Sequence, residues 1–335
     1  MALFKLAKFK ILSLITSSQL RTLPRDGTLL AVNGFEGAMI PVGIDAMGVK
    51  EMWKENLQGQ GIFCAVVDTG IESKHSELSG AVIEKYWLPE LRDEPLYQHG
   101  THIAGTISAR GMLRGVAPKC GLIDVRVYNS KGEARDGGVA EGIRWINRRI
   151  TEGLNVRVVN LSLGGKAYVE EVALELAKLD QQGVAVVVAA GNGGDGKADT
   201  TETSFPASVV TSIAVAAYNP RDNTIADFSE SNEYLSCAAP GVQVLSTFPG
   251  GYGVLDGTSM AAAHVSGFCC LLFQKISQQQ PQLKGRPLLQ EVKRQLLHNY
   301  SVNPESKGYS REYGYGYLKY GVILKDMEVK QLQQK

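Results

Sequence analysis

Residues 156–189 have the sequence VRVVNLSLGGKAYVEEVALELAKLDQQGVAVVVA, and this stretch decides the fold. Both of its ends are short, nearly continuous apolar runs rich in valine, as expected for strands that are buried on both faces of a sheet. The segment between them, Val169–Gln182, has helical periodicity, and Gly183 follows it as a natural C-terminal stop. A strand, a helix and a second strand in this order predict parallel strands joined by a crossover helix.

The same alternation continues on both sides of this stretch, from about residue 60 onward. We therefore expect an α/β fold, a doubly wound and mostly parallel sheet with helices on both faces. Catalytic groups in such folds lie at the carboxyl ends of the strands. The expected strands are Ile62–Val67, Leu122–Val127, Val156–Leu161, Val184–Ala189, Ser212–Ala216 and Val242–Leu245, and the expected helices are Gly138–Ile150, Val169–Gln182, Thr258–Phe273 and Pro287–His298.

The composition is that of a folded protein without a strongly charged surface. Of the 335 residues, 44% are hydrophobic and 21% are charged, which argues against disorder. Thirty-five basic and 34 acidic residues leave a net charge of +1, which indicates neither a basic nucleic-acid groove nor a membrane-surface patch. The uncharged windows are interrupted by Pro, Gly, Ser or His, and we expect no membrane helix.

The cysteines and the N-terminus bear on the cellular compartment. The five cysteines form no CxxC or Cys/His metal-binding spacing, and we expect reduced, buried thiols. The first twenty residues are partly apolar, but three lysines interrupt them and no small-residue cleavage site is clear. We therefore expect a cytoplasmic protein; the alternative is secretion by an atypical N-terminal signal.

Three short motifs contain polar residues of the kinds that serve in catalysis. Asp68 ends a predicted strand in AVVDTG, His99 opens HGTHIAGT, and Ser259 lies between a flexible glycine and an alanine-rich helix in GTSMAAAH. Each has an ordinary alternative explanation. Asp68 could be a turn or cap residue, and Thr258 or Ser259 could be a helix N-cap. His99 could bind zinc with His102, although no third zinc ligand is obvious.

Taken together, the three residues favour a catalytic triad. A serine hydroxyl becomes a good nucleophile only when a neighbouring imidazole takes its proton, and that imidazole needs a buried carboxylate to orient it. Asn192, in the glycine-rich AAGNGG, follows another predicted strand, and its side-chain N–H could join the Ser259 N–H in binding an oxyanion. In isolation, Asn192 is equally well explained as a left-handed turn residue.

The sequence resembles the subtilisin-type serine proteases, the subtilases. The resemblance rests on VVDTG, HGTHIAGT, NLSLGG, AAGNGG and GTSMAAAHVSG, which occur in the family's order, and it covers roughly residues 44–322. It implies a triad of Asp68, His99 and Ser259. It also implies that Asn192 donates a hydrogen bond to the oxyanion.

The resemblance also indicates where a substrate would bind. Ser162, Leu163 and Gly164 resemble the edge that pairs with the substrate backbone and borders the primary pocket. The loop 130–134, with Gly132 at its centre, would be the opposite edge. An extended peptide would then lie between the two edges as an added strand.

The primary pocket and the loop opposite it bear on specificity. Ser204, which precedes Phe205 and Pro206, occupies the place where the family lines the floor of this pocket. It predicts an apolar residue of medium to large size before the scissile bond. The charged residues of the loop 131–136 either belong to a solvated loop with no role in substrate selection or narrow the range of accepted substrates, as in a processing protease.

The N-terminal region makes the chain most similar to the intracellular bacterial subtilases. The sequence GVKEMW at 48–53 precedes the first strand, and no clear export signal is present. Members of that type resemble this chain in having a short extension whose Leu-Ile-Pro-Tyr motif covers the active site until it is cleaved. LRTLP at 20–24 has a comparable place, but Arg25 stands where the tyrosine would be. The expected organisation is an N-terminal extension at 1–43 that could act as an inhibitory propeptide, a peptidase domain at 44–322 and a charged tail at 323–335.

Two departures from the family's pattern concern a helix and a metal site. Ala263 replaces the proline that usually follows Ser-Met-Ala-Ala, which removes no catalytic group. The segment 106–114, where the family's common calcium loop lies, is shortened, and Glu77 stands where a ligand aspartate is usual. Calcium takes roughly six to eight oxygen ligands, so this strong site should be weakened or lost. No cofactor is expected for the chemistry, and a structural calcium ion is left open.

The predicted function is that of a serine endopeptidase that cleaves extended polypeptides through an acyl-enzyme. The alternative is a catalytically silent relative that binds peptides or regulates another protein, and the intact set of chemical residues argues against it. We expect a protein or peptide substrate as the partner, with no nucleic acid and no membrane. A homodimer is a reasonable expectation for a cytoplasmic enzyme.

Overall fold

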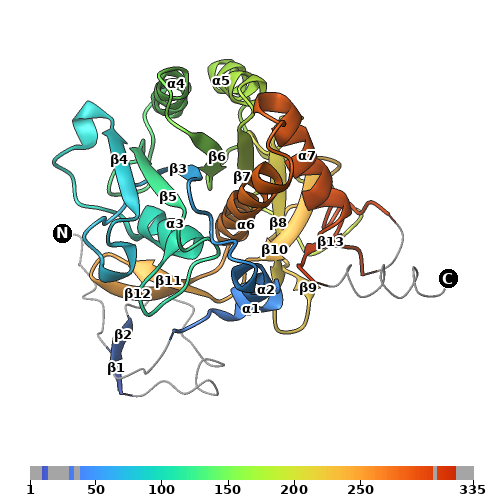
Figure 1. Ribbon diagram of the computed structural model, residues 1–335, viewed down its shortest axis with the longest axis horizontal. Coiled ribbons are helices and arrows are strands. Elements are labelled where there is room, and N and C mark those ends of the chain that lie inside the picture. Colours follow the sequence, from blue (N-terminus) through green and yellow to red (C-terminus); the bar gives the residue numbers. More distant parts are fainter. Residues whose placement is uncertain (1–9, 14–29, 34–37, 305–307, 322–335) are drawn as a thin grey trace.

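A computed structural model describes residues 10–13, 30–33, 38–304 and 308–321 (Figure 1). Its main element is a ten-stranded sheet of order β13-β14-β10-β8-β7-β6-β3-β5-β4, with β9 paired to β8. Apart from the pairs made by β9 and β13, its strand pairs are parallel, which confirms the predicted α/β fold. The strands are β3 (Phe63–Asp68), β4 (Val82–Trp87), β5 (Gly121–Arg126), β6 (Val156–Leu161), β7 (Ala185–Ala189), β8 (Ile213–Asn219), β9 (Thr224–Ile225), β10 (Leu235–Pro240), β13 (Ser301–Val302) and β14 (Tyr317–Leu318).

Helices cover both faces of this sheet (Figure 1). Successive side chains of a strand point to opposite faces, so Cys64 and Val66 of β3 pack in one core with α3 and α6, while Ala65 and Val67 pack in the other with α4 and α5. Because both faces are buried, most residues of the central strands are apolar, and the exceptions include Asp124 and Arg126 of β5 and Asn160 of β6. The helices are α1 (Val42–Ala46), α2 (Val49–Lys54), α3 (Gln98–Ser108), α4 (Gly138–Thr151), α5 (Glu170–Gln181), α6 (Thr258–Gln279) and α7 (Gly285–His298), with 3₁₀ turns at Ser76–Leu78 and Pro89–Leu91.

One predicted strand belongs to a different sheet. The prediction that Val242–Leu245 continues the parallel sheet is wrong, because β11 (Val244–Phe248) pairs antiparallel with β12 (Gly251–Leu255). Together with two short strands from the N-terminal region, β1 (Lys10–Ser13) and β2 (Leu30–Asn33), they form a separate sheet of order β1-β2-β12-β11. The strand beside β8 is instead β10, whose sequence LSCAAP has small side chains and weak β propensity but is buried at every position.

Part of the predicted N-terminal extension lies in this second sheet. Residues Lys10–Ser13 form β1, and Leu30–Asn33 form β2, which pairs with β12 through Leu30 and Tyr252. The family-like segment at 20–25 and the predicted tail at 323–335 lie outside the described residues.

Helix α6 fixes the position of the serine motif. It begins at Thr258, as predicted, and continues beyond Phe273 to Gln279 while packing against β6, β7 and β8. By length and composition it is the one helix in the described part of the chain that could span a membrane, but 89% of its apolar window is buried inside the fold. Its N-terminus lies near the carboxyl end of β6, because Ser259 is hydrogen-bonded to Ser162, the residue that follows this strand.

Candidate active site

Asp68 and His99 are in direct contact at the carboxyl end of β3. Asp68 is the last residue of that strand and is 3% exposed, and His99 lies in the first turn of α3. His99 Nδ1 lies 2.9 Å from each Asp68 carboxylate oxygen, and the Thr69 N–H donates to Oδ1 over 2.7 Å. With Nδ1–H donating to Asp68, the imidazole keeps Nε2 as its proton acceptor.

The surroundings of His99 raise its pKa above the ordinary value of 6.5. Burial is the largest influence and lowers the pKa, but the charge of Asp68 and its hydrogen bond together outweigh burial. The Asp68 carboxylate therefore stabilises the imidazolium that forms when His99 takes a proton.

The close packing around Gly100 explains why a glycine follows His99 in the motif. A Cβ built at this position would lie 2.5 Å from Gly70 O and 3.1 Å from Asp68 Oδ1. The Gly100 N–H donates to Thr69 Oγ1 over 2.9 Å. The absence of a side chain lets α3 approach the end of β3 closely enough for His99 to reach Asp68.

Ser259 lies in the first turn of α6 and is joined to the segment after β6. Its Oγ donates to Ser162 O over 3.2 Å, and Ser162 Oγ donates to Ser259 O over 2.9 Å. Ser259, His99 and Asn192 line one cavity. The structure thus brings together three predicted site residues from α3, α6 and the loop after β7.

The amide of Asn192 is oriented by Thr258, which the sequence analysis considered only as a helix N-cap. Asn192 Oδ1 accepts hydrogen bonds from the Thr258 N–H and from Thr258 Oγ1, each over 2.9 Å. Because the oxygen is held, the amide nitrogen is directed away from Thr258 and remains available as a donor. A Cβ built on Gly257 would lie 3.4 Å from this nitrogen, which places it beside the turn that leads to Ser259.

The two predicted substrate edges face a common groove. A cavity of about 320 Å³ has on its walls residues of both predicted edges, two of the catalytic candidates and two tyrosines. These residues are Asp68, Thr69, Tyr97, His99, Tyr128, Lys131, Gly132, Ser162, Leu163 and Gly164. A second cavity of about 470 Å³ continues from Tyr128, Leu163 and Gly164 to Phe205 and Pro206, and it offers room for substrate side chains.

A family model described as the subtilase family matches residues 59–316. The chain belongs to the subtilase family. Its relatives include the major intracellular serine protease of Bacillus subtilis (strain 168), which is 37% identical over 243 residues, or 70% of this chain and 75% of that protein. The intracellular serine protease of Paenibacillus polymyxa is 34% identical over 246 residues, or 70% of this chain and 73% of that protein. The subtilisin of Bacillus pumilus is 36% identical over 244 residues, or 70% of this chain and 85% of that protein.

Membership of the subtilase family confirms the main functional prediction. This subtilase is a serine-type endopeptidase, which works through an acyl-enzyme formed on an Asp-His-Ser triad. The similarity to proteins named intracellular serine proteases also agrees with the predicted type.

In this subtilase Ser204 is hydrogen-bonded to a glutamate that the sequence analysis missed. Ser204 is 6% exposed, and its Oγ donates to Glu230 Oε1 over 2.9 Å. Glu230 is 1% exposed and also pairs with Lys166. It lies in the polar sequence FSESNE, where no apolar pattern indicates burial.

The described residues around Glu77 do not fit the family's calcium site. Glu77 is 3% exposed, and its Oε2 accepts from the Leu113 N–H over 2.9 Å while its Oε1 accepts from the Tyr252 O–H over 2.5 Å. Both carboxylate oxygens therefore bind protein donors at the place where the family binds the ion. Nor do the described residues contain a group of three or more His, Cys, Asp or Glu side chains that could hold a metal ion.

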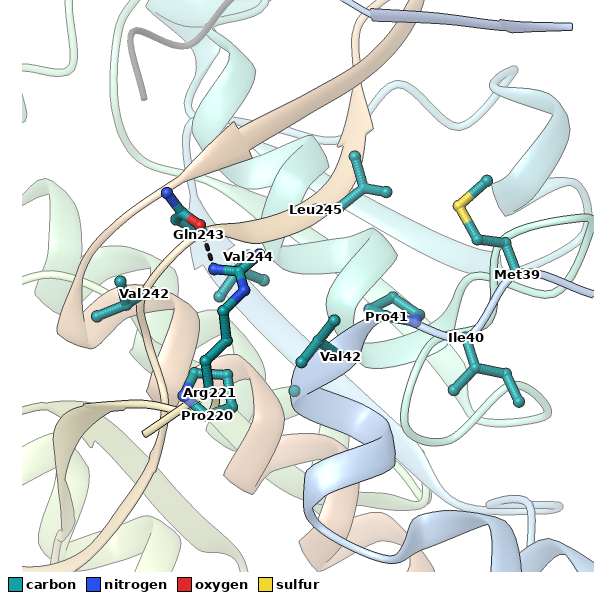
Figure 2. Close-up of a pocket in the computed structure, with 11 residues that line it drawn as sticks. Met39, Ile40, Pro41, Val42, Pro220, Arg221, Val242, Gln243, Val244 and Leu245 are labelled. Atoms are coloured by element: carbon teal, nitrogen blue, oxygen red, sulfur yellow. Dashed lines mark hydrogen bonds between the residues drawn. The ribbon is translucent and has the colours of Figure 1, made fainter. Parts of the chain in front are cut away.

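Figure 2 shows a different pocket of the subtilase, where the segment 39–43 meets Pro220, Arg221 and the segment 242–245. The Arg221 side chain donates to Gln243 across it. None of the predicted site residues lines this pocket. It is therefore separate from the candidate active site.

Proposed function

We propose that Ser259 is the nucleophile of this endopeptidase, that His99 is its general base and that Asp68 orients His99. The observation that supports this assignment is the 2.9 Å contact between His99 Nδ1 and Asp68, in a cavity that His99 shares with Ser259. Ser259 Oγ would attack the peptide carbonyl carbon while His99 Nε2 takes its proton. The proton would then pass to the leaving amine, and water would release the acyl group by the same route.

Asn192 and the first turn of α6 would hold the oxygen that becomes negative. The Ser259 N–H belongs to the helix's first turn, whose N–H groups lack partners within the helix and carry a partial positive charge. Asn192 would add its side-chain N–H as a second donor. Removal of one such donor typically lowers the rate about 10²–10³-fold.

The Ser259 hydroxyl would reach its reactive position by rotation about one bond. In the structure it donates to Ser162 O over 3.2 Å. Catalytic hydrogen bonds often form fully only in the complex with substrate, and a serine rotamer change is fast. An extended peptide between Ser162–Gly164 and Gly132 would place its carbonyl beside this hydroxyl.

A fluorophosphonate, which reacts with activated serines, tests the assignment. We expect intact-mass analysis of the full-length protein to show one adduct, located on Ser259, and no adduct on the Ser259→Ala variant. The mass before reaction also shows whether the N-terminus has been trimmed. No adduct on a trimmed and folded protein would contradict the assignment and favour the catalytically silent alternative.

The N-terminal extension is proposed to be inhibitory. The support is the place of LRTLP at 20–24 before Trp53, since the segment itself lies outside the described residues. Deletion of residues 1–30 should raise peptidase activity per folded molecule, measured with the same peptide substrate. An unchanged activity would contradict this proposal.

The finer statements on compartment and partners are also proposals. A cytoplasmic location is supported by five free, buried cysteines, because a reducing compartment keeps thiols unpaired. No nucleic-acid or membrane partner is proposed, in line with the net charge of +1. A homodimer stays a prediction, and light scattering of the purified chain tests it.

A further inference from the structure

A buried carboxylate that the proposed triad does not use is hydrogen-bonded to Ser204, the predicted floor residue of the primary pocket. Glu230 is 1% exposed, and its Oε1 accepts from Ser204 Oγ over 2.9 Å and from Lys166 Nζ over 2.7 Å. Its Oε2 is buried and has no hydrogen-bond partner among the described residues. A buried acceptor without a hydrogen-bond donor is unfavourable, so Oε2 can accept a hydrogen bond from a bound ligand.

Glu230 lies against the turn that contains Asn192. A Cβ built on Gly191 would lie 2.5 Å from Glu230 Cδ, and one built on Gly193 would lie 3.0 Å from Glu230 Oε1. The Glu230 N–H also donates to Gly191 O over 3.2 Å. Since Gly191 and Gly193 flank Asn192, the carboxylate is close to the wall of the pocket that would receive the side chain before the scissile bond.

The opposite wall of this pocket, the substrate edge at Gly164, contacts the segment that contains Ser204. A Cβ built on Gly164 would lie 3.8 Å from Ser204 Cβ, and the backbones of Gly165 and Phe205 exchange hydrogen bonds of 2.9 and 2.8 Å. Ser204 therefore lies directly below the substrate edge, with Glu230 as its hydrogen-bond partner.

Lys166 shows what kind of group this carboxylate accepts. Its side chain is 67% exposed, yet its ammonium reaches Glu230 Oε1 at 2.7 Å, with longer contacts to Thr203 O at 3.3 Å and Ser204 Oγ at 3.5 Å. Lys166 follows the substrate edge at Gly164 and so reaches the floor from the rim. Only the ammonium of Lys166 enters the buried region while most of its flexible side chain stays in solvent, so a substrate cation can take its place at Glu230.

We propose that the primary pocket selects arginine or lysine before the scissile bond and that Glu230 is the specificity residue. This inference rests on the proposed function, because the pocket is defined by its place beside Asn192 and Ser259. A guanidinium or ammonium group satisfies Glu230 Oε2 and takes over the contact that Lys166 makes with Oε1. An apolar side chain, as expected from Ser204 alone, satisfies neither oxygen. A carboxylate at the base of the pocket is an established way for a protease to select basic residues.

The test compares peptides that differ only in the residue before the scissile bond, which is arginine, lysine, methionine or glutamate. The full-length protein and the variant that lacks residues 1–30 are both assayed on these peptides, and Ser259→Ala provides the blank. We expect kcat/KM for arginine and lysine to exceed that for methionine by about tenfold to hundredfold, the range for a charge-assisted hydrogen bond. Glu230→Gln should lower the arginine-to-methionine ratio by a similar factor, and Lys166→Met should raise that ratio.

Two kinetic outcomes would overturn the inference. One is an equal kcat/KM for arginine and methionine in the unaltered protein. The other is a Glu230→Gln variant that loses activity toward both peptides by the same factor, which is the result of a structural role.

If neither the full-length protein nor the variant that lacks residues 1–30 cleaves any peptide above the blank, the proposed function fails, and binding then tests the pocket. Fluorescence anisotropy compares labelled arginine and methionine peptides on the Ser259→Ala protein from which residues 1–30 have been deleted. Preferential binding of the arginine peptide, lost when Glu230→Gln is added, would support the inference. Equal binding of the two peptides, or no binding of the arginine peptide, would overturn it.

Discussion

Thr258 orients Asn192, and replacement of Thr258 by valine tests whether that orientation matters for catalysis. Asn192 Oδ1 accepts from the N–H and from the hydroxyl of Thr258, each over 2.9 Å, and the same hydroxyl accepts from the Gly191 N–H over 3.2 Å. Thr258→Val keeps the side-chain shape and the backbone hydrogen bond but removes the hydroxyl. One neutral hydrogen bond contributes about 0.5–1.5 kcal/mol, so we expect kcat to fall about twofold to thirteenfold with little change in KM.

Steady-state kinetics on one peptide substrate measure this effect, alone and in combination with Asn192→Ala. Asn192→Ala should lower kcat about 10²–10³-fold. Thr258→Val should add little to that loss, because it acts through Asn192. Thr106→Val is the matched control, since it removes a buried threonine hydroxyl that donates to His102 O over 3.0 Å, and it should leave kcat unchanged. An equal loss from Thr258→Val with and without Asn192 would refute the reasoning.

Three further predictions concern activity against pH, stability against pH, and metal binding. The pH profile of kcat/KM should rise through a pKa above 6.5, because the reaction needs neutral His99 and Asp68 raises the pKa of His99. Asp68→Asn should move this inflection to lower pH and lower kcat about 10⁴-fold. An inflection that does not move would contradict the assignment. The raised pKa of His99 in the folded state also affects stability: the contribution of the His99–Asp68 contact is fully present below pH 6.5 and is lost as the pH rises through the folded-state pKa. Thermal melts of the unaltered protein and of Asp68→Asn across this pH range measure the effect. Glu77→Ala should lower the free energy of unfolding by about 1–3 kcal/mol because two donors lose their acceptor, whereas EDTA should leave the Tm of the unaltered protein unchanged; a large fall with EDTA would show that calcium stabilises the fold.

The strands predicted best are those whose side chains fill both cores. Val156–Leu161 matches β6 because its apolar run is buried on both faces. Strand β10 was missed because LSCAAP lacks the branched residues that indicate a strand, although all six residues are buried. Strand β4 was missed because it lies at the edge of the sheet, with side chains that are exposed or half-buried. The run at 242–245 was placed in the wrong sheet, since an apolar run does not say which strand it pairs with.

The active site was predictable where its chemistry is local in the sequence. A strand end such as Asp68 and a helix start such as Ser259 carry their own turn and glycine signals. The bond between Thr258 and Asn192 joins residues 66 positions apart, and that between Ser204 and Glu230 joins residues 26 positions apart. Neither pairing leaves a periodic or compositional pattern, so only the folded chain reveals it.

The pairing of Glu230 with a cation also follows from the position of its carboxylate beside Asn192, the proposed oxyanion donor. Its carboxylate lies against Gly191 and Gly193, on either side of the Asn192 donor. An unbalanced negative charge there would oppose the negative charge that develops on the substrate oxygen, since such interactions are strong in a site that excludes water. Lys166 supplies the balancing charge in the free enzyme, and a basic substrate side chain supplies it in the complex. An exposed lysine beside a buried glutamate is therefore expected of a pocket that exchanges its own cation for that of the substrate.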